Sequence, residues 1–299
     1  MDRKDRMIFV AGATGNQGGA VARHLLREGW RVRGLTRETA KAESQAMARL
    51  GAEMVAGDME DRDLLQRMMQ GCYGAFSVQN TWTAGAEAEI RQGRNMAEAA
   101  QGAGVTHFVY TSVGGSERNS GVPHFESKWQ VEQHIRSLQM DEATILRPVW
   151  FMDNFASPWF APGIADGKLR IGMEPDRTLQ MIAVDDIGAF AAMAFAKPDA
   201  FMGREVEIAG DELTMPEFAD AIGQAAGRRV EFEYLTPQQE KDKLGEDWVS
   251  MVRWFNEQGY RAEIPRLRQM HPGLMDFGTW LRQSPLAAAR PTAPTRRAG

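Results

Sequence analysis

Residues 7–18 read MIFVAGATGNQG, and this stretch decides the fold. Its first five residues are apolar without alternation, which is typical of a strand buried on both faces. A glycine-rich turn follows, and the spacing of the next apolar residues predicts a helix that stops at Gly29. Glycines between a strand and a helix permit a tight turn and a close approach to a pyrophosphate, which the helix N-terminus attracts. The stretch therefore predicts a dinucleotide-binding turn formed by Gly12, Thr14, Gly15, Asn16, Gln17 and Gly18.

The alternation of strand and helix continues to about residue 150. Short apolar strands are predicted at residues 31–35, 54–56, 75–78, 107–111 and 144–146, with a helix over 39–50 and further glycine-terminated helical stretches between them. Such βαβ units build a parallel sheet covered by helices on both faces. The predicted fold class is therefore a doubly wound α/β Rossmann fold, which later segments such as residues 179–184 are candidates to rejoin.

The sequence changes character after Pro148, where aromatic residues and prolines crowd together and the alternation becomes irregular. A Thr-x-x-Glu capping box at Thr214 predicts the start of a later helix. From Gln283 onward the chain has three prolines, three arginines and no acidic residue, which favours disorder. We expect a first domain over residues 1–150, a second over 151–282 and a disordered tail over 283–299.

The composition excludes several classes of protein. The chain has 299 residues, a formal net charge of −5 and a single cysteine, Cys72, so it has no internal disulfide. A net acidic chain is a poor direct nucleic-acid binder, and the longest apolar run, residues 189–196, is too short for a membrane helix. No signal-peptide core follows the charged start, and the histidines have no metal-ligand spacing. We expect a cytoplasmic protein without a metal, a membrane contact or a direct nucleic-acid partner.

The end of the second predicted strand indicates which dinucleotide binds. An NAD site carries an acidic residue about 20 residues beyond the glycines, where it bonds the ribose 2′-hydroxyl. Residues 31–37 contain no acid, and the cations Arg37 and Lys41 follow the strand. Each charge-assisted hydrogen bond to a 2′-phosphate contributes about 1.5–3 kcal/mol. The sequence therefore predicts NADP(H), and the alternative is that both cations are solvated charges whose field Glu38 blunts.

Several of these motifs together resemble the NmrA-like family, a branch of the atypical short-chain dehydrogenase/reductases. The resemblance covers about residues 7–280 and is carried by the glycine turn, Arg37, Gly57-Asp58, residues 124–128 (HFESK) and residues 146–148 (LRP). It implies a Rossmann NADP(H)-binding domain followed by a smaller C-terminal α/β substrate domain. It also implies further cofactor-binding residues, namely Asp58, Met59, Gln79, Asn80, Thr81, Lys128, Trp150, Phe151 and Asn154.

The same resemblance points to three catalytic candidates. Carbonyl-reducing members of the wider superfamily carry Tyr-x-x-x-Lys on a helix, where the lysine lowers the pKa of the phenol. This chain has His124 in the place of the tyrosine and Lys128 in the place of the lysine, and Ser112 resembles the serine that holds a substrate oxygen. An imidazole beside an ammonium donates a proton poorly at pH 7. His124 is thus either a proton donor or a residue that packs or orients a ligand, and Lys128 is either catalytic or only a ribose clamp.

An aromatic and methionine cluster is open to two interpretations. It lines an apolar pocket for a planar ligand, or it forms ordinary core between the domains. Its members are Trp82, Trp150, Phe151, Met152, Phe155 and Trp159.

Two functions from different classes remain. The first is an NADPH-dependent reductase of an apolar quinone, imine or activated carbonyl compound, since the cofactor turn is followed by a lysine and an aromatic cluster. The second is a non-catalytic NADP(H) redox sensor that regulates a protein partner, which the missing tyrosine favours. The identity of the substrate, the stereochemistry and the oligomeric state do not follow from the sequence.

Overall fold

The structure, a computed structural model, describes residues 3–288, which divide into two compact units. Unit 1 consists of residues 3–149, 184–209 and 261–272, and unit 2 of residues 150–183, 210–260 and 273–288. The first passage between the units falls at Val149 and Trp150, next to the predicted boundary. The units are not contiguous in sequence, because two later segments, residues 184–209 and 261–272, belong to unit 1.

Unit 1 is built on a parallel sheet. Within the described residues the sheet has seven strands in the order β10-β6-β5-β4-β1-β2-β3. The order reverses between β1 and β4, and doubly wound sheets bind ligands at the carboxyl ends of the strands beside such a reversal. The predicted fold class is confirmed. The strands are β1 Met7–Val10, β2 Arg31–Thr36, β3 Glu53–Ala56, β4 Gly74–Ser77, β5 His107–Thr111, β6 Thr144–Pro148 and β10 Glu205–Ile208.

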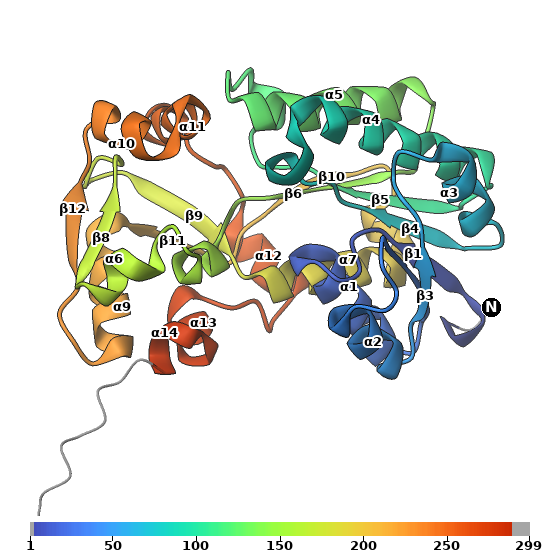
Figure 1. Ribbon diagram of the computed structural model, residues 1–299, viewed down its shortest axis with the longest axis horizontal. Coiled ribbons are helices and arrows are strands. Elements are labelled where there is room, and N and C mark those ends of the chain that lie inside the picture. Colours follow the sequence, from blue (N-terminus) through green and yellow to red (C-terminus); the bar gives the residue numbers. More distant parts are fainter. Residues whose placement is uncertain (1–2, 289–299) are drawn as a thin grey trace, which may run out of the picture. The chain divides into compact units, whose positions relative to one another are not determined.

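Helices cover both faces of this sheet, with α3, α4 and α5 on one face and α1, α2 and α7 on the other (Figure 1). Helices α1 and α7 pack closely, because a Cβ on Gly188 would lie only 2.7 Å from the carbonyl carbon of Ala20. The helices of unit 1 are α1 Asn16–Arg27, α2 Ala42–Arg49, α3 Arg62–Met69, α4 Thr81–Gly102, α5 Pro123–Ser137, α7 Val184–Ala196, α8 Pro198–Phe201 and α12 Ile264–Met270, with 3-10 turns η1 Arg3–Asp5 and η2 Ser116–Arg118.

Unit 2 is smaller, and its described residues form a three-stranded sheet, β11-β9-β7, and a two-stranded sheet, β12-β8. The predicted capping box begins α9, where the hydroxyl of Thr214 accepts from the Glu217 amide and the Glu217 carboxylate accepts from the Thr214 amide. The strands are β7 Trp150–Phe151, β8 Lys168–Ile171, β9 Thr178–Ile182, β11 Asp211–Thr214 and β12 Glu231–Tyr234. The helices are η3 Met152–Ala156, α6 Ala161–Ala165, α9 Met215–Ala226, α10 Pro237–Leu244, α11 Glu246–Glu257, α13 Phe277–Gln283 and α14 Pro285–Ala288.

Two expectations about the later part of the chain were wrong. Residues 179–184 do not rejoin the first sheet, because β9 pairs with β7 and β11. The strand that does rejoin is β10, which reads Glu-Val-Glu-Ile and pairs with β6. The predicted disordered tail starts too early, because α14 packs against α9 and buries Leu286. Residues 289–299 of that predicted tail lie outside the described residues.

Candidate active site

The glycine turn connects β1 to α1 at the carboxyl edge of the seven-stranded sheet. Gly12 has a φ of +59°, a conformation that favours glycine, and its carbonyl accepts from the Gly15 amide at 2.8 Å. A Cβ on Gly18 would lie 2.3 Å from the Gly12 carbonyl oxygen, so a side chain there would push α1 away from the turn. Among the described residues no side chain caps the N-terminus of α1, whose first amides are therefore free to bind a phosphate. The turn fits a pyrophosphate.

The other predicted residues of the turn differ in their surroundings. Thr14 is half-buried and Asn16 is exposed at the first turn of α1. The side chain of Gln17 already bonds another residue of the protein, because its Oε1 accepts a hydrogen bond from the Thr111 hydroxyl at 2.8 Å. This bond ties the start of α1 to the end of β5. Gln17 can therefore offer a ligand its backbone amide more readily than its side chain.

The two cations predicted to recognise a 2′-phosphate follow β2 but are not equivalent. Arg37 is exposed, and its guanidinium has no hydrogen-bond or ion-pair partner in the part of the chain that the structure describes. Lys41 is also exposed, but its Nζ lies 3.0 Å from Glu38 Oε1. Glu38 therefore compensates Lys41 and not Arg37. Arg37 is the cation of this pair that remains for a phosphate.

Asp58, Met59 and Gln79, which the family resemblance assigns to the adenine and ribose, follow β3 and β4. The Oδ1 atom of Asp58 accepts from the Glu60 amide at 3.0 Å. Gln79 is buried, and its Nε2 donates to Ser77 Oγ at 2.9 Å and lies 3.7 Å from the Met59 sulfur. The side chains of Asp58 and Gln79 thus already bond within unit 1, and their predicted cofactor contacts stay predictions.

Glu89 of α4 is a fully buried charge, whose side chain is 0% exposed. Its Oε1 accepts from Lys128 Nζ at 2.7 Å, and its Oε2 accepts from the hydroxyls of Ser127 and Thr81. Burial alone would raise the pKa of Glu89, but the ammonium and the two hydroxyls hold that pKa below its ordinary value. The carboxylate is therefore charged at neutral pH. We call these four residues the Glu89 cluster.

Helix α4 is broken between two members of this cluster, Thr81 and Glu89. Gly85 has a φ of 82° and a ψ of 167°, so the first turn of α4 is set apart from the rest of the helix. Asn80 caps this turn, because its Oδ1 accepts from the Trp82 amide at 3.0 Å. The Trp82 side chain is exposed and its ring centroid lies 5.3 Å from that of His124. The break therefore sets the position of an exposed indole beside the start of α5.

His124 stands one helical turn before Lys128, as predicted, but little of it is exposed. The residue is 8% exposed, and its ring contacts Phe125 at a centroid distance of 4.9 Å as well as Trp82. A ligand could reach only a small part of the imidazole. This environment suits the packing interpretation of His124 better than the role of an obligate proton donor.

Ser112, the third catalytic candidate, follows the end of β5. Its amide donates to the Leu146 carbonyl at 2.7 Å, which fixes the backbone. Its side chain is buried, and within the described residues its Oγ has no hydrogen-bond partner. A buried hydroxyl without a partner costs free energy and calls for an explanation such as a bound ligand. The Oγ atom is itself buried, even more than the His124 ring, so the predicted role of Ser112 in holding a substrate oxygen stays a prediction.

The residues predicted to form an apolar pocket are divided between the two units. Trp82 belongs to unit 1 and the others to unit 2, where Met152 and Phe155 are fully buried. Trp150 is also buried, Phe151 and Asn154 are half-buried, and Trp159 is 69% exposed. Met152 and Phe155 are therefore core residues of unit 2, and the predicted pocket and nicotinamide contacts stay predictions. The rings around Trp150 and Phe155 are Phe160, Phe218, Trp248, Phe255 and Phe277.

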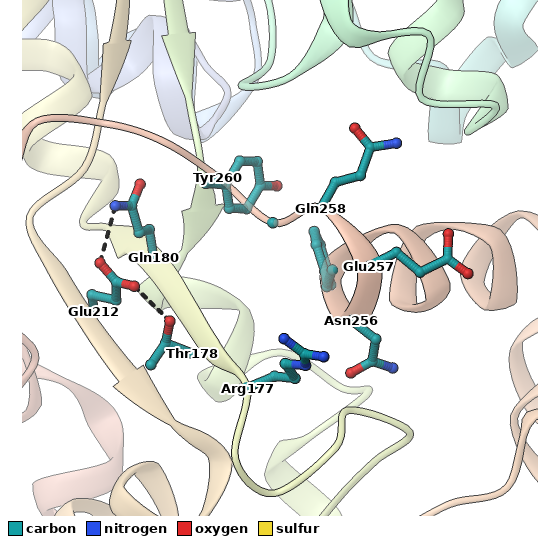
Figure 2. Close-up of a pocket in the computed structure, with 10 residues that line it drawn as sticks. Arg177, Thr178, Gln180, Glu212, Asn256, Glu257, Gln258 and Tyr260 are labelled. Carbon is teal, nitrogen blue, oxygen red and sulfur yellow. Dashed lines mark hydrogen bonds between the residues drawn. The ribbon is translucent and has the colours of Figure 1, made fainter.

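A polar hollow of about 130 Å³ lies within unit 2 (Figure 2). On one side of it Glu212 accepts hydrogen bonds from the Thr178 hydroxyl at 2.5 Å and from Gln180 Nε2 at 3.1 Å. The exposed Arg177 lies at another side. Its lining includes none of the described residues that were predicted for an apolar pocket, so it is a separate feature. The remaining lining residues are Phe255, Asn256, Glu257, Gln258, Gly259 and Tyr260.

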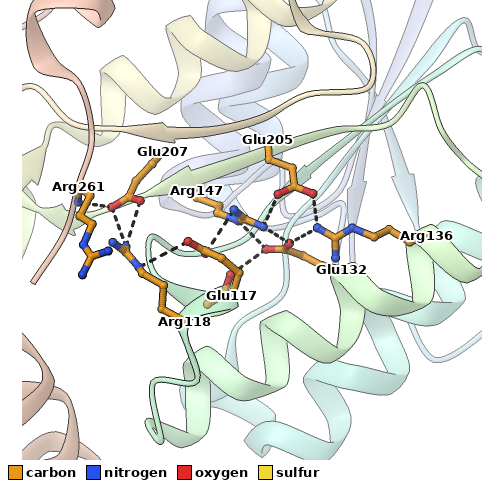
Figure 3. Close-up of polar contacts among 9 residues, drawn as sticks. Glu117, Arg118, Glu132, Arg136, Arg147, Glu205, Glu207 and Arg261 are labelled. Carbon is orange, nitrogen blue, oxygen red and sulfur yellow. Dashed lines mark hydrogen bonds and ion pairs between the residues drawn. The ribbon is translucent and has the colours of Figure 1, made fainter. Parts of the chain in front are cut away.

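A second buried carboxylate in unit 1, Glu132 of α5, is surrounded by arginines (Figure 3). Arg147 of β6 binds both of its oxygens, with Nε at 3.1 Å from Oε1 and Nη2 at 2.6 Å from Oε2. Ser116 donates to Oε1 at 2.9 Å and Arg136 to Oε2 at 3.1 Å. We call these residues, with Glu117 and Glu205, the Glu132 cluster. It joins η2, α5, β6 and β10, and so fixes the segment that follows Ser112.

A buried histidine belongs to the core of unit 1. His107 is 0% exposed, and its Nε2 lies 2.8 Å from the Thr144 hydroxyl, which itself donates to the Phe201 carbonyl. Burial lowers the pKa of His107 to about 4. Within residues 3–288 no group of three or more His, Cys, Asp or Glu side chains is arranged to hold a metal ion. In the same range no helix has both the length and the apolar character needed to cross a membrane.

Glu89 is the site residue that the sequence reasoning missed. Its partners Ser127 and Lys128 are 38 and 39 residues away, and no motif links them to it. A signal was nevertheless present, because Glu89, Gly93 and Met96 follow helical i, i+4, i+7 spacing. Gly93 faces Val131 and Met96 is fully buried, so an acid on that face had to find a partner.

Comparison with known proteins identifies the family. The model of the NmrA-like family matches residues 4–279, and the chain belongs to that family. This confirms the resemblance seen in the sequence. The NmrA-like family domain-containing oxidoreductase hkm9 of Aspergillus hancockii is 30% identical over 268 residues, with 82% of this chain and 80% of that protein covered.

Solved structures show the same fold. The Citrobacter sp. triphenylmethane reductase complexed with NADP(H) is similar with a TM-score of 0.80 and 18% identity, covering 93% of this chain and 99% of that one. NmrA, a negative transcriptional regulator, in complex with NADP is similar with a TM-score of 0.79 and 20% identity, covering 94% of this chain and 95% of that one. NmrA has also been solved in complex with NAD. These two solved proteins are thus a reductase bound to NADP(H) and a regulator bound to NADP or NAD.

Proposed function

We propose that this protein is an NADPH-dependent reductase of an apolar, planar acceptor, such as a quinone, an imine or an activated carbonyl compound. The observation that carries the proposal is a pair of cations expected to meet the two ends of the cofactor. Arg37, which follows β2, has no partner within residues 3–288, and Lys128 at the start of α5 is held by the buried Glu89. The relatives named as oxidoreductases support the same class of activity.

The residues of the chain bind and orient the reactants in this proposal. NADPH, when bound, supplies the hydride. The amides of the glycine turn bind the pyrophosphate, Arg37 binds the 2′-phosphate, and Lys128 donates to the hydroxyls of the nicotinamide ribose. The hydroxyl of Ser112, which is buried and has no partner within residues 3–288, donates to an oxygen or nitrogen of an acceptor that reaches it. Because His124 is largely buried, acceptors that need no proton from a side chain are favoured.

The preference for NADPH over NADH tests the proposed role of Arg37 in cofactor binding. We expect Arg37→Ala to weaken NADPH binding roughly ten- to hundredfold, because one charge-assisted bond to the 2′-phosphate is lost, and to change NADH binding little. Fluorescence titration with both cofactors measures this. Lys41→Ala is the matched control and has a smaller effect, because Glu38 already compensates Lys41. Equal losses for NADPH and NADH would overturn the assignment of Arg37.

Turnover of an acceptor tests the proposed reductase activity. NADPH oxidation is followed with a panel of quinones, imines and ketones, beside the Lys128→Ala variant. We expect turnover with at least one apolar acceptor and a large loss in the variant. The burial of His124 favours a second candidate, a non-catalytic NADP(H) sensor that regulates a protein partner. Tight NADP(H) binding without turnover of any acceptor would support the sensor instead.

A further inference from the structure

The Glu89 cluster indicates how the cofactor site is preorganised before a ligand binds. We propose that Glu89 is a positioning residue, whose carboxylate holds the Lys128 ammonium where it meets the ribose next to the nicotinamide. This inference rests on the proposed function, because it concerns the same cofactor site. It assigns to Glu89 a role that acts through Lys128 and not through direct contact with a ligand.

The first argument is that Glu89 cannot easily move. Its carboxylate is fully buried, and both oxygens are bonded to groups from two helices. Thr81 lies in the first turn of α4, before the break at Gly85, whereas Ser127 and Lys128 lie in α5. The bond from Thr81 spans the break, and the bonds from α5 hold the other side. The carboxylate is therefore fixed with respect to both elements.

The second argument is that Lys128 has donors left over. Its side chain is 14% exposed, and Glu89 is its only ion-pair or hydrogen-bond partner in the described part of the chain. An ammonium has three N–H donors, so two remain for hydroxyl groups of a ligand. A lysine side chain without such a partner is free to rotate about several bonds, and it would lose this conformational entropy when the cofactor binds. Because Glu89 already holds the side chain, part of this entropy is lost on folding, and less is lost when the cofactor binds.

Glu89→Gln tests the inference, because it keeps the shape of the side chain and removes its charge. We expect the Kd values for NADPH and NADH to rise by the same factor, about tenfold, because the ribose next to the nicotinamide is common to both cofactors. Arg37→Ala, in contrast, separates the two cofactors. Glu98→Gln is the matched control, since Glu98 also lies in α4 and also bonds a residue of α5, His134. We expect this control to bind both cofactors as the wild type does.

A double-mutant cycle separates positioning from a general structural role. In a Lys128→Ala background, Glu89→Gln should cause no further loss of NADPH affinity, because the residue that Glu89 positions is gone. A loss of similar size in both backgrounds would overturn the inference, as would an unchanged Kd in Glu89→Gln when Lys128→Ala weakens binding. Should Glu89→Gln not fold, Glu89→Asp takes its place and is expected to raise both Kd values. A wild-type protein that binds neither cofactor would instead overturn the proposed function, a distinct result.

Discussion

Glu89 and Glu132 are both fully buried carboxylates in neighbouring helices of unit 1, yet their surroundings differ. Glu132 faces two guanidinium groups, and Arg147 binds it with two nitrogens. Arg147 also bonds Glu117 and Glu205, so its N–H donors are taken up by carboxylates within the cluster. Glu89 faces a single ammonium and two hydroxyls, and the ammonium keeps donors to spare.

The difference distinguishes a cluster that holds the fold from one that is ready for a ligand. The planar guanidinium matches a carboxylate with two parallel bonds and leaves little for other partners. The lysine ammonium is a point charge on a flexible stem, so it can hold its carboxylate and bind something else as well. We therefore expect the Glu132 cluster to matter most for stability and the Glu89 cluster most for cofactor affinity.

The largest effect is expected from Arg147→Ala, which leaves Glu132 buried without its main partner. The free energy of unfolding should fall by about 3–5 kcal/mol, as is usual when one partner of a buried ion pair is removed. Urea denaturation followed by circular dichroism measures this change. Arg91→Ala breaks an exposed ion pair with Glu60 and should cost less than about 1 kcal/mol. Similar losses in the two variants would show that the Glu132 cluster does not hold the fold.

His107 sharpens the comparison, because it is buried, has no ionic partner in the described part of the chain and stays neutral. Its pKa is about 4 in the folded chain and ordinarily 6.5, so the unfolded chain binds more protons between these values. The stability due to this shift is complete above pH 6.5 and is lost as the pH falls towards 4, by about 3 kcal/mol. Urea denaturation at several pH values should show this loss in the wild type. The same slope in His107→Gln would mean that other groups cause it.

A smaller effect on stability is expected from Glu89→Gln, about 1.5–3 kcal/mol, because the partly exposed Lys128 can turn towards water. The pKa of Glu89 is lowered from its ordinary 4.5, so its contribution is present above that value and is lost as the pH falls below it. The difference between variant and wild type should therefore be constant from pH 8 to about pH 5 and shrink in more acidic solution. A difference that grows on acidification would contradict the assigned direction of the shift.

The smallest effect compares two serines that each donate to one of the buried carboxylates, Ser127 to Glu89 and Ser116 to Glu132. Ser127→Ala should cost more than Ser116→Ala, by about 1 kcal/mol, because Glu89 has fewer other donors. Both variants are measured by urea denaturation under the same conditions. Equal costs would show that the number of other donors around each carboxylate does not matter.

The sequence predicted those parts of the molecule whose signals are local. The strand Met7–Val10, the turn from Gly12 to Gly18 and helix α1 are adjacent in the chain, and each has a direct physical signature. The same holds for the capping box at Thr214. The exposed position of Arg37 directly after the second strand follows from the same local pattern, and its contact with a 2′-phosphate stays a prediction.

The features that sequence reasoning missed depend on distant partners. Strand β10 looks polar, because Glu205 and Glu207 belong to it, and these acids are matched by Arg147 and Arg118 far away in the sequence. Glu89 is matched by residues of a different helix. Two later segments, residues 184–209 and 261–272, return to unit 1. Their amino-acid composition does not change where the chain passes from one unit to the other, so the sequence does not reveal these boundaries.

The interrupted course of unit 1 has a consequence for its synthesis. A ribosome that has released residues 1–149 has made six of the seven strands, but β6 still lacks its neighbour β10 and α1 lacks α7. Until those segments emerge, a nascent sheet edge and an apolar helix face stay open to other chains. A protein truncated at residue 149 should therefore aggregate during expression, and chaperone demand should fall only once translation has passed residue 272.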